Sequence, residues 1–245
     1  MGLFGFGKDD AEVLNRDVAV TRSALERAKV GDEGGMAGAA ARLMERLLDT
    51  GIDGRGPLKS ADTIAIDALE KRGSADGAIA EIVKDHTALA AGGGFVTSLG
   101  GFITMPVALP ANLVEFYLLA TRMVASIAKV RGYDIDRPEI RSAILLTLVG
   151  ADADDLLKKA GVVASGRLSN LAAQRLPGPI LMVVNKAVAF RLLSTAGRST
   201  LARFGKGLPV AGGFVGAGLD VYLIRKIADA ARNEFPQVGD APGNR

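Results

Sequence analysis

The sequence contains no cysteine, no tryptophan and a single histidine among its 245 residues. Without cysteine, the chain cannot form disulfides, bind metals through thiolates or use a cysteine nucleophile. A lone histidine gives no His/Cys cluster for a metal, so we expect neither a metal nor a cofactor. Aromatic residues make up only 5% of the chain, whereas 49% of the residues are hydrophobic and 31 are glycine. The chain is therefore rich in small and aliphatic side chains.

Motifs for phosphate or calcium binding are also missing. Gly2–Lys8 has the spacing of a phosphate-binding loop, but Asp9 replaces the required Ser or Thr and no strand precedes it. The carboxylates Asp152, Asp154 and Asp155 lack the central glycine and terminal glutamate of a calcium loop. We interpret them as the solvated start of a helix.

Charge is absent from Thr87 to Val114, and this stretch is rich in glycine. Its length would suffice to cross a bilayer. Two prolines and five glycines nevertheless favour a broken, protein-buried pair of helices, since freed backbone groups need partners. A shorter glycine-rich segment spans 208–220, and both segments contain Gly-Gly-Phe-Val. We expect the two segments to pack together through small residues, which are Gly94, Ser98, Gly101, Gly212, Gly213 and Gly216.

Acidic residues are scarce in the C-terminal part. Residues 1–155 hold 17 basic and 23 acidic residues, whereas residues 156–245 hold 13 basic and 4 acidic residues. Such a basic region favours contact with anionic lipid headgroups. The alternatives are that it neutralises the acidic half of the same protein, or that it binds nucleic acid, which we do not expect. The cations that we single out for membrane contact are Lys186, Arg198, Arg203 and Lys206.

The hydrophobic pattern has a helical period and no sustained alternation, so the sequence predicts an all-α fold. We expect a multi-helix bundle around the two glycine-rich helices, preceded by an N-terminal helical hairpin. The divisions are a flexible apolar N-terminus (1–8), the hairpin (9–49), a linker (50–59), the main helical domain (60–236) and a disordered tail (237–245). The hairpin would dock on the main domain or on a second copy of itself, which would give a homo-oligomer.

Start and stop signals place individual helices. Ser60 is an N-cap candidate and Gly73 an end. A helix over 111–131 would end before Gly132, and a helix that begins with a capping box at Asp136, with Pro138 at or near its first position, would run through Val149. Further glycines, among them Gly197, would separate the remaining helices.

Several motifs resemble those of the EcsC family. They are GGFVTSLGGFITMPVALPANL, RGYDIDRPEIR with AILLTLVG, FRLLSTAG and LPVAGGFVGAGLD, in this order over about 56–235. The resemblance implies an α-helical, membrane-associated bacterial protein from a family named after a gene beside an ABC exporter. It implies no settled activity. The chain departs from the family pattern at Asn112, where an aspartate is expected.

Few polar side chains qualify as a ligand site or polar cluster. His86 shares a helix face with Ile79 and Ile82, which is typical of a core histidine bonded to a carbonyl or carboxylate; the alternative is a proton-responsive or ligand-contacting role. Asp220 shares a face with glycines and needs a cation or donors. The candidate residues are His86, Asn112, Arg122, Arg191 and Asp220.

The N-terminus carries apolar side chains that can enter a bilayer interface, namely Leu3, Phe4 and Phe6. It shows no signal-peptide pattern, so we expect a cytoplasmic protein, peripherally associated with a membrane, with integral attachment as the alternative. We expect a non-catalytic protein that contacts anionic phospholipid or a membrane protein, such as one linked to a transporter. The alternatives are an enzyme acting on a lipid or membrane-derived substrate and an oligomeric scaffold.

Overall fold

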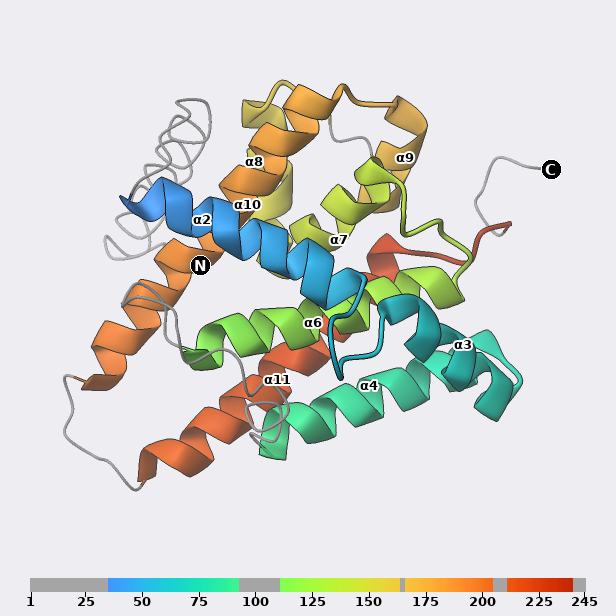
Figure 1. Cartoon of the computed structure of the whole chain (residues 1–245), viewed down its shortest axis with the longest axis horizontal. Helices are drawn as coiled ribbons and strands as arrows, with labels where there is room; N and C mark the ends of the chain where they lie inside the picture. The colour runs from blue at the N-terminus through green and yellow to red at the C-terminus, as the bar shows by residue number, and fades with distance from the viewer. Residues whose placement is uncertain (1–34, 93–110, 164–165, 205–210, 240–245) are drawn as a thin grey trace, which may run out of the picture.

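The computed structural model describes residues 35–92, 111–163, 166–204 and 211–239, drawn in colour in Figure 1. For 35–37, 111–113, 195–204 and 211–217 it describes the backbone alone. Within these ranges every regular element is a helix and no strand is present, which confirms the all-α prediction. The α-helices are α2 (Gly35–Arg46), α3 (Ala61–Arg72), α4 (Ala75–Gly92), α6 (Ala111–Val130), α7 (Pro138–Val149), α8 (Ala153–Lys159), α9 (Leu171–Gln174), α10 (Gly178–Phe204) and α11 (Ala211–Glu234). Shorter turns are the π-helix η1 (Leu47–Ile52) and the 3₁₀ turns η3 (Gly150–Asp152) and η4 (Leu168–Asn170).

Helix α6 is the central element of the bundle. It contacts α3, α4, η1, α7 and α11, and Figure 1 shows it between α2 above and α4 below. Apolar residues occupy all sides of α6, as expected of a helix that is buried all round. Leu118, Met123 and Ile127 are each fully buried. The predicted end of this helix is also confirmed, since Gly132 follows it with φ +90°.

The boundaries of α3 and α4 follow the sequence signals. The Ser60 hydroxyl accepts a hydrogen bond from the backbone N–H of Thr63 at 3.1 Å, and Gly73 closes α3 in the left-handed conformation with φ +68°. Ser74 caps α4 by accepting from the Gly77 N–H. The buried Glu81 of α4 accepts hydrogen bonds from Lys71 and Arg72 of α3, so it fixes the turn between the two helices.

Two expected boundaries differ. The capping box predicted at Asp136 is wrong, because Arg137 is the N-cap of α7 and no side chain caps this end. The predicted place of Pro138, at the first helical position, is confirmed. Proline suits that position since its missing N–H needs no partner there. Gly197 ends no helix but lies within α10, because an isolated glycine costs only about 1 kcal/mol in a helix that tertiary packing supports.

The segment before the main domain is part of the core. Over α2 and η1 the apolar side chains Leu43, Leu47 and Ile52 are buried, and α2 packs against α10 of the same chain. The predicted linker is helical in its first residues, because η1 continues to Ile52. Residues 9–34 of the predicted hairpin lie outside the described residues.

The structure describes the glycine-rich stretches only in part. Helix α4 continues from Thr87 to Gly92, and α6 begins at Ala111. The residues in between, including Gly94, Ser98 and Gly101, lie outside the described residues. Gly212, Gly213 and Gly216 belong to α11, but their surroundings are likewise not described.

Candidate functional site

His86 is buried where α4 packs against α6. Its side chain is 3% exposed, and Nδ1 lies 2.7 Å from the carbonyl oxygen of Ile82, one turn earlier in α4. A carbonyl can only accept, so Nδ1 carries the proton and Nε2 is left as an acceptor. Nε2 is buried and has no hydrogen-bond partner among the described residues. Burial lowers the pKa of His86 to about 4, and the nearby positive charge of Arg122 contributes to this shift.

Arg122 links α6 to the N-terminal segment. Its Nη2 donates to the carbonyl oxygen of Thr50 at 3.2 Å, and its side chain is 5% exposed. Thr50 lies near the end of η1, where the last carbonyls of a helix have no partner within the helix. Burial lowers the pKa of Arg122 to about 10, which leaves the guanidinium charged at neutral pH. The structure thus brings together two of the predicted polar residues, His86 and Arg122. Both are buried from solvent where α4, α6 and η1 pack together.

Arg191 lies in a second buried polar contact. Its Nε donates to the carboxylate of Asp152 at 2.9 Å, which joins α10 to η3. The hydroxyl of Tyr117 on α6 is near this pair: burial raises the pKa of Tyr117 to about 12, while the charge of Arg191 acts in the opposite direction. Asp152 is therefore more than a solvated helix start, because it neutralises a cation that is 7% exposed.

For the other candidate residues the structure describes only the burial, only the backbone, or nothing. Asp220 is half-buried on α11 and Lys186 is half-buried on α10. Asn112 lies in the first turn of α6, and Arg198 and Arg203 lie in α10, but their side chains are outside the described set. Lys206, Leu3, Phe4 and Phe6 lie outside the described residues altogether.

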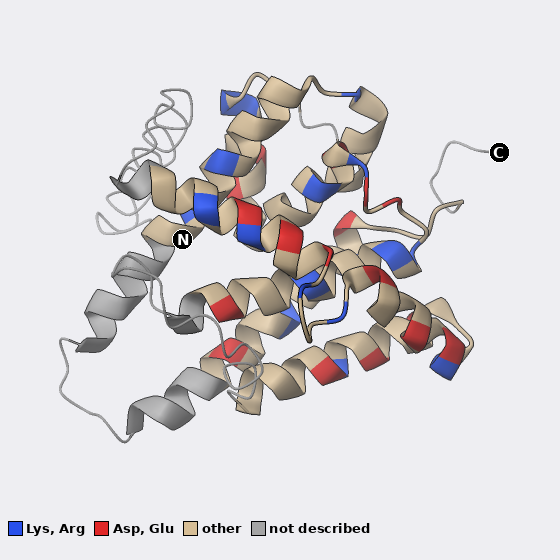
Figure 2. Cartoon of the chain, viewed as in Figure 1, with Lys and Arg blue, Asp and Glu red and all other residues tan. Residues whose placement is uncertain are grey.

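Basic and acidic residues both occur among the described helices (Figure 2). Two cations of the C-terminal half pair with carboxylates of the N-terminal half: Arg191 with Asp152, and Lys159 with Asp155 at 2.6 Å. Some of the basic excess is thus neutralised within the chain.

A groove runs between α4 and α11 on the outside of the bundle, with a volume of about 560 Å³. The α4 side of its lining is formed by Ala80, Val83, Lys84, Thr87, Ala88 and Ala91. The α11 side is formed by Val221, Arg225 and Arg232. The lining is mainly apolar and carries three cations, with no carboxylate among its described residues. Its size falls within the range of about 300–1,000 Å³ that is usual for small-molecule sites.

The outer face of α11 adjoins this groove and carries exposed apolar side chains. Tyr222 is 60% exposed and Leu219 is 39% exposed. Leu219, Tyr222 and Lys226 recur at i, i+3 and i+7, so they share one side of the helix. We refer to these three residues as the α11 strip. Within the described parts of the chain, no helix combines the length and the hydrophobicity needed to cross a membrane.

The groove was not predicted from the sequence. The alanines Ala80, Ala88 and Ala91 lie on the same side of α4 as Lys84, and the exposed Arg225 lies one turn after Val221. Once the bounds of α4 are known, the helical spacing of these alanines and Lys84 can be recognised in the sequence. Only the packing of α4 against α11 shows that these residues face another helix.

The chain matches the model of one known protein family. The model of the EcsC protein family matches residues 57–237, from the turn before α3 to the residues after α11. No curated protein and no solved structure matches the chain. Because the matched residues make up well over half of the chain, the protein belongs to the EcsC family.

Proposed function

We propose that this protein is a non-catalytic, peripheral membrane-associated protein that binds surfaces containing anionic phospholipid, on the cytoplasmic side. The observation that carries the proposal is the α11 strip together with Arg225. Exposed Tyr222 and Leu219 offer apolar area for the boundary between headgroups and acyl chains, and tyrosine suits that boundary because one end is apolar and the other is polar. Arg225 and Lys226 supply positive charge beside them, worth about 1 kcal/mol each near an anionic surface.

The arrangement fits surface contact better than catalysis. A reaction would need polar side chains that a substrate can reach, whereas His86 and Arg122 are 3% and 5% exposed. The groove is lined by neither of these residues. The apolar and basic side chains of α11 are exposed, as contact with a membrane surface requires.

The proposal is tested by sedimentation with phosphatidylcholine vesicles, with or without phosphatidylglycerol, over a range of salt concentrations. We expect binding to increase with the anionic lipid and to weaken as salt screens the charges. The double substitution Arg225→Gln/Lys226→Gln should weaken binding to anionic vesicles about tenfold or more. The double substitution Leu219→Ser/Tyr222→Ser should remove the component that survives high salt.

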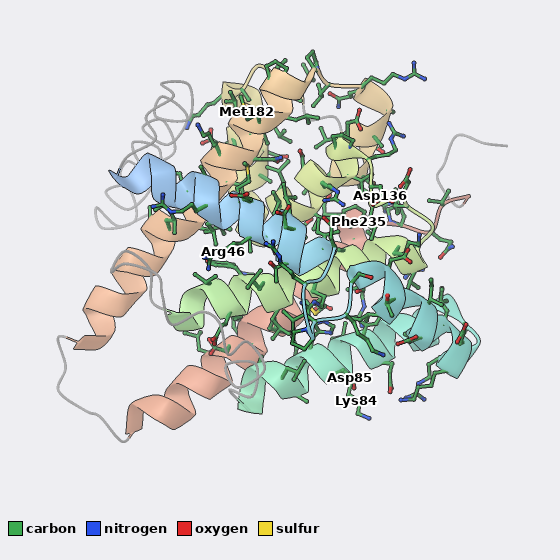
Figure 3. All side chains as sticks on the ribbon, viewed as in Figure 1. Arg46, Lys84, Asp85, Asp136, Met182 and Phe235 are labelled. Carbon is green, nitrogen blue, oxygen red and sulfur yellow. The ribbon has the colours of Figure 1, made fainter. Side chains whose placement is uncertain are left out.

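Matched controls use exposed residues on other helices. Arg42→Gln/Lys158→Gln removes two exposed cations from α2 and α8, and Met182→Ser removes an exposed apolar side chain from α10, labelled in Figure 3. These variants should bind as the unaltered protein does. Equal binding of the unaltered protein to neutral and anionic vesicles would refute the proposal. Binding to anionic vesicles that Arg225→Gln/Lys226→Gln does not change would refute it too, since the α11 cations would then have no role.

A further inference from the structure

The groove between α4 and α11 has the form of a binding site for a narrow apolar chain. Ala80, Ala88 and Ala91 face it with side chains of a single methyl group, so α4 leaves space beside α11. Val83 and Val221 complete the apolar part of the lining. Burial of an apolar ligand there would be favoured because its surface is removed from water.

The cations of the groove indicate the charge of the ligand. Lys84 and Arg225 are exposed and form no ion pair with any described residue, whereas Arg232 is paired with Asp229 at 2.9 Å. Figure 3 shows Lys84 projecting from α4 on the outer side of the bundle. Two unpaired cations beside an apolar groove fit a ligand with an apolar tail and an anionic head. A neutral ligand would leave them without a partner.

Thr87 adds a hydroxyl group to this lining. It lines the groove, and its Oγ1 is buried without a hydrogen-bond partner among the described residues. Buried polar atoms are almost always hydrogen-bonded, so a rotation about χ1 of Thr87 that turns Oγ1 into the groove would let an oxygen atom of a ligand satisfy it. An ester or phosphate oxygen of a lipid would provide such a partner.

From these observations we propose that the groove binds a single molecule of anionic phospholipid, with one acyl chain between α4 and α11 and the phosphate beside Lys84 and Arg225. This inference rests on the proposed function and adds a ligand class and a site to it. It implies that the protein does more than adhere to a surface, because it withdraws one chain of a lipid from its neighbours.

The test uses the full-length protein and single-chain lipids at concentrations where they are monomeric. Oleoyl lysophosphatidic acid should bind with 1:1 stoichiometry in calorimetry. Oleoyl lysophosphatidylcholine, which has the same chain and no net charge, should bind at least about tenfold more weakly. Inorganic phosphate alone should not compete, since the site depends on the chain.

Two variants probe the two halves of the site. Ala88→Trp fills the groove from an exposed position and should abolish binding of lysophosphatidic acid, while the control Ala173→Trp, at an exposed alanine of α9, should leave it unchanged. Lys84→Gln/Arg225→Gln should weaken binding of lysophosphatidic acid about tenfold and leave lysophosphatidylcholine unaffected, whereas Arg42→Gln/Lys158→Gln should change neither. Circular dichroism and the thermal midpoint establish that each variant is folded.

The outcomes separate this inference from the proposed function. Ala88→Trp adds an apolar side chain to the surface and should therefore retain binding to anionic vesicles while it loses the single-chain lipid. If the unaltered protein binds vesicles but not monomeric lysophosphatidic acid, the groove site is refuted and surface association stands. Binding of lysophosphatidic acid that Ala88→Trp does not change would also refute the groove site.

Discussion

His86 and Arg122 are two of the few polar side chains in a largely aliphatic core, and each is accommodated by a hydrogen bond to a backbone carbonyl. An imidazole that is 3% exposed is stable there only because it is neutral and Nδ1 donates to the Ile82 carbonyl. The guanidinium of Arg122 lies nearby and stays charged, and it donates a hydrogen bond to the carbonyl oxygen of Thr50. The pair therefore favours the structure in which the histidine carries no proton on Nε2.

This contact predicts a pH dependence of stability. The pKa of His86 is lowered from 6.5 to about 4, so the unfolded chain binds a proton at a pH where the folded chain does not. Stability that is fully present above about pH 6.5 is then lost as the pH falls towards 4, by about 3 kcal/mol in total. Urea unfolding at several pH values between 7 and 4.5 measures this loss.

The control for that measurement is His86→Gln, which cannot titrate. The pKa of Glu115 is raised by burial, so this carboxyl shifts stability in the opposite direction as the pH falls. Because Glu115 is present in both proteins, the difference between their curves isolates His86, the only histidine of the chain. A difference that does not change between pH 7 and 4.5 would contradict the assignment.

At the scale of elements, the contact between η1 and α6 is set by one glycine. A Cβ added at Gly51 would lie 3.0 Å from Cγ2 of Thr121 and 3.1 Å from its Cβ, closer than these atoms pack without a shift. Gly51 therefore permits the close approach that brings the neighbouring Thr50 carbonyl to Arg122. Small side chains have the opposite consequence in α4, where the alanines leave the groove open.

We predict that Gly51→Val destabilises the protein by about 1–3 kcal/mol through overpacking. The matched control is Gly218→Ala, since a Cβ at Gly218 in α11 meets nothing within 4 Å. That substitution should stabilise the protein by about 0.4–1 kcal/mol, because it restricts the unfolded chain and suits a helix. Chemical denaturation measures both changes, and equal effects of the two substitutions would contradict the close contact at Gly51.

At the scale of the whole molecule, the folded unit extends beyond the family match. The match begins at residue 57, yet α2 and η1 contribute Leu43, Leu47 and Ile52 to the core. Asp53, just after η1, forms a two-fold ion pair with Arg141 of α7. The N-terminal segment thus covers α6 and α10, and it is held by apolar burial at its centre and by polar contacts at its end.

Deletion of residues 1–56 should therefore prevent stable folding of the remaining chain. Loss of three fully buried side chains costs about 5–9 kcal/mol, comparable to the whole stability of a domain. We expect the truncated chain to aggregate or to lose cooperative thermal unfolding in calorimetry. Asp53→Asn, which removes only a partly exposed ion pair, should cost about 1 kcal/mol or less. A truncated chain that unfolds cooperatively near the original midpoint would contradict this prediction.

The sequence alone determined the helical class, the family and several helix ends. These features depend on local signals: the hydroxyl of Ser60 has its donor, the N–H of Thr63, three residues away, and Gly73 and Gly132 take a positive φ that glycine adopts without steric cost. It also indicated that His86 lies on an apolar face. The prediction that Gly197 separates two helices is wrong, because the packing of α10 outweighs the low helix propensity of one glycine.

The tertiary structure alone decided which distant groups meet. The contact of Arg122 with Thr50 joins residues 72 positions apart, and that of Arg141 with Asp53 joins residues 88 apart. The groove likewise exists only because α4 lies against α11, which follows it in the chain by more than a hundred residues. Such contacts are fixed by the joint packing of several helices, and no local pattern in one helix specifies which partner its exposed alanines and cations will face.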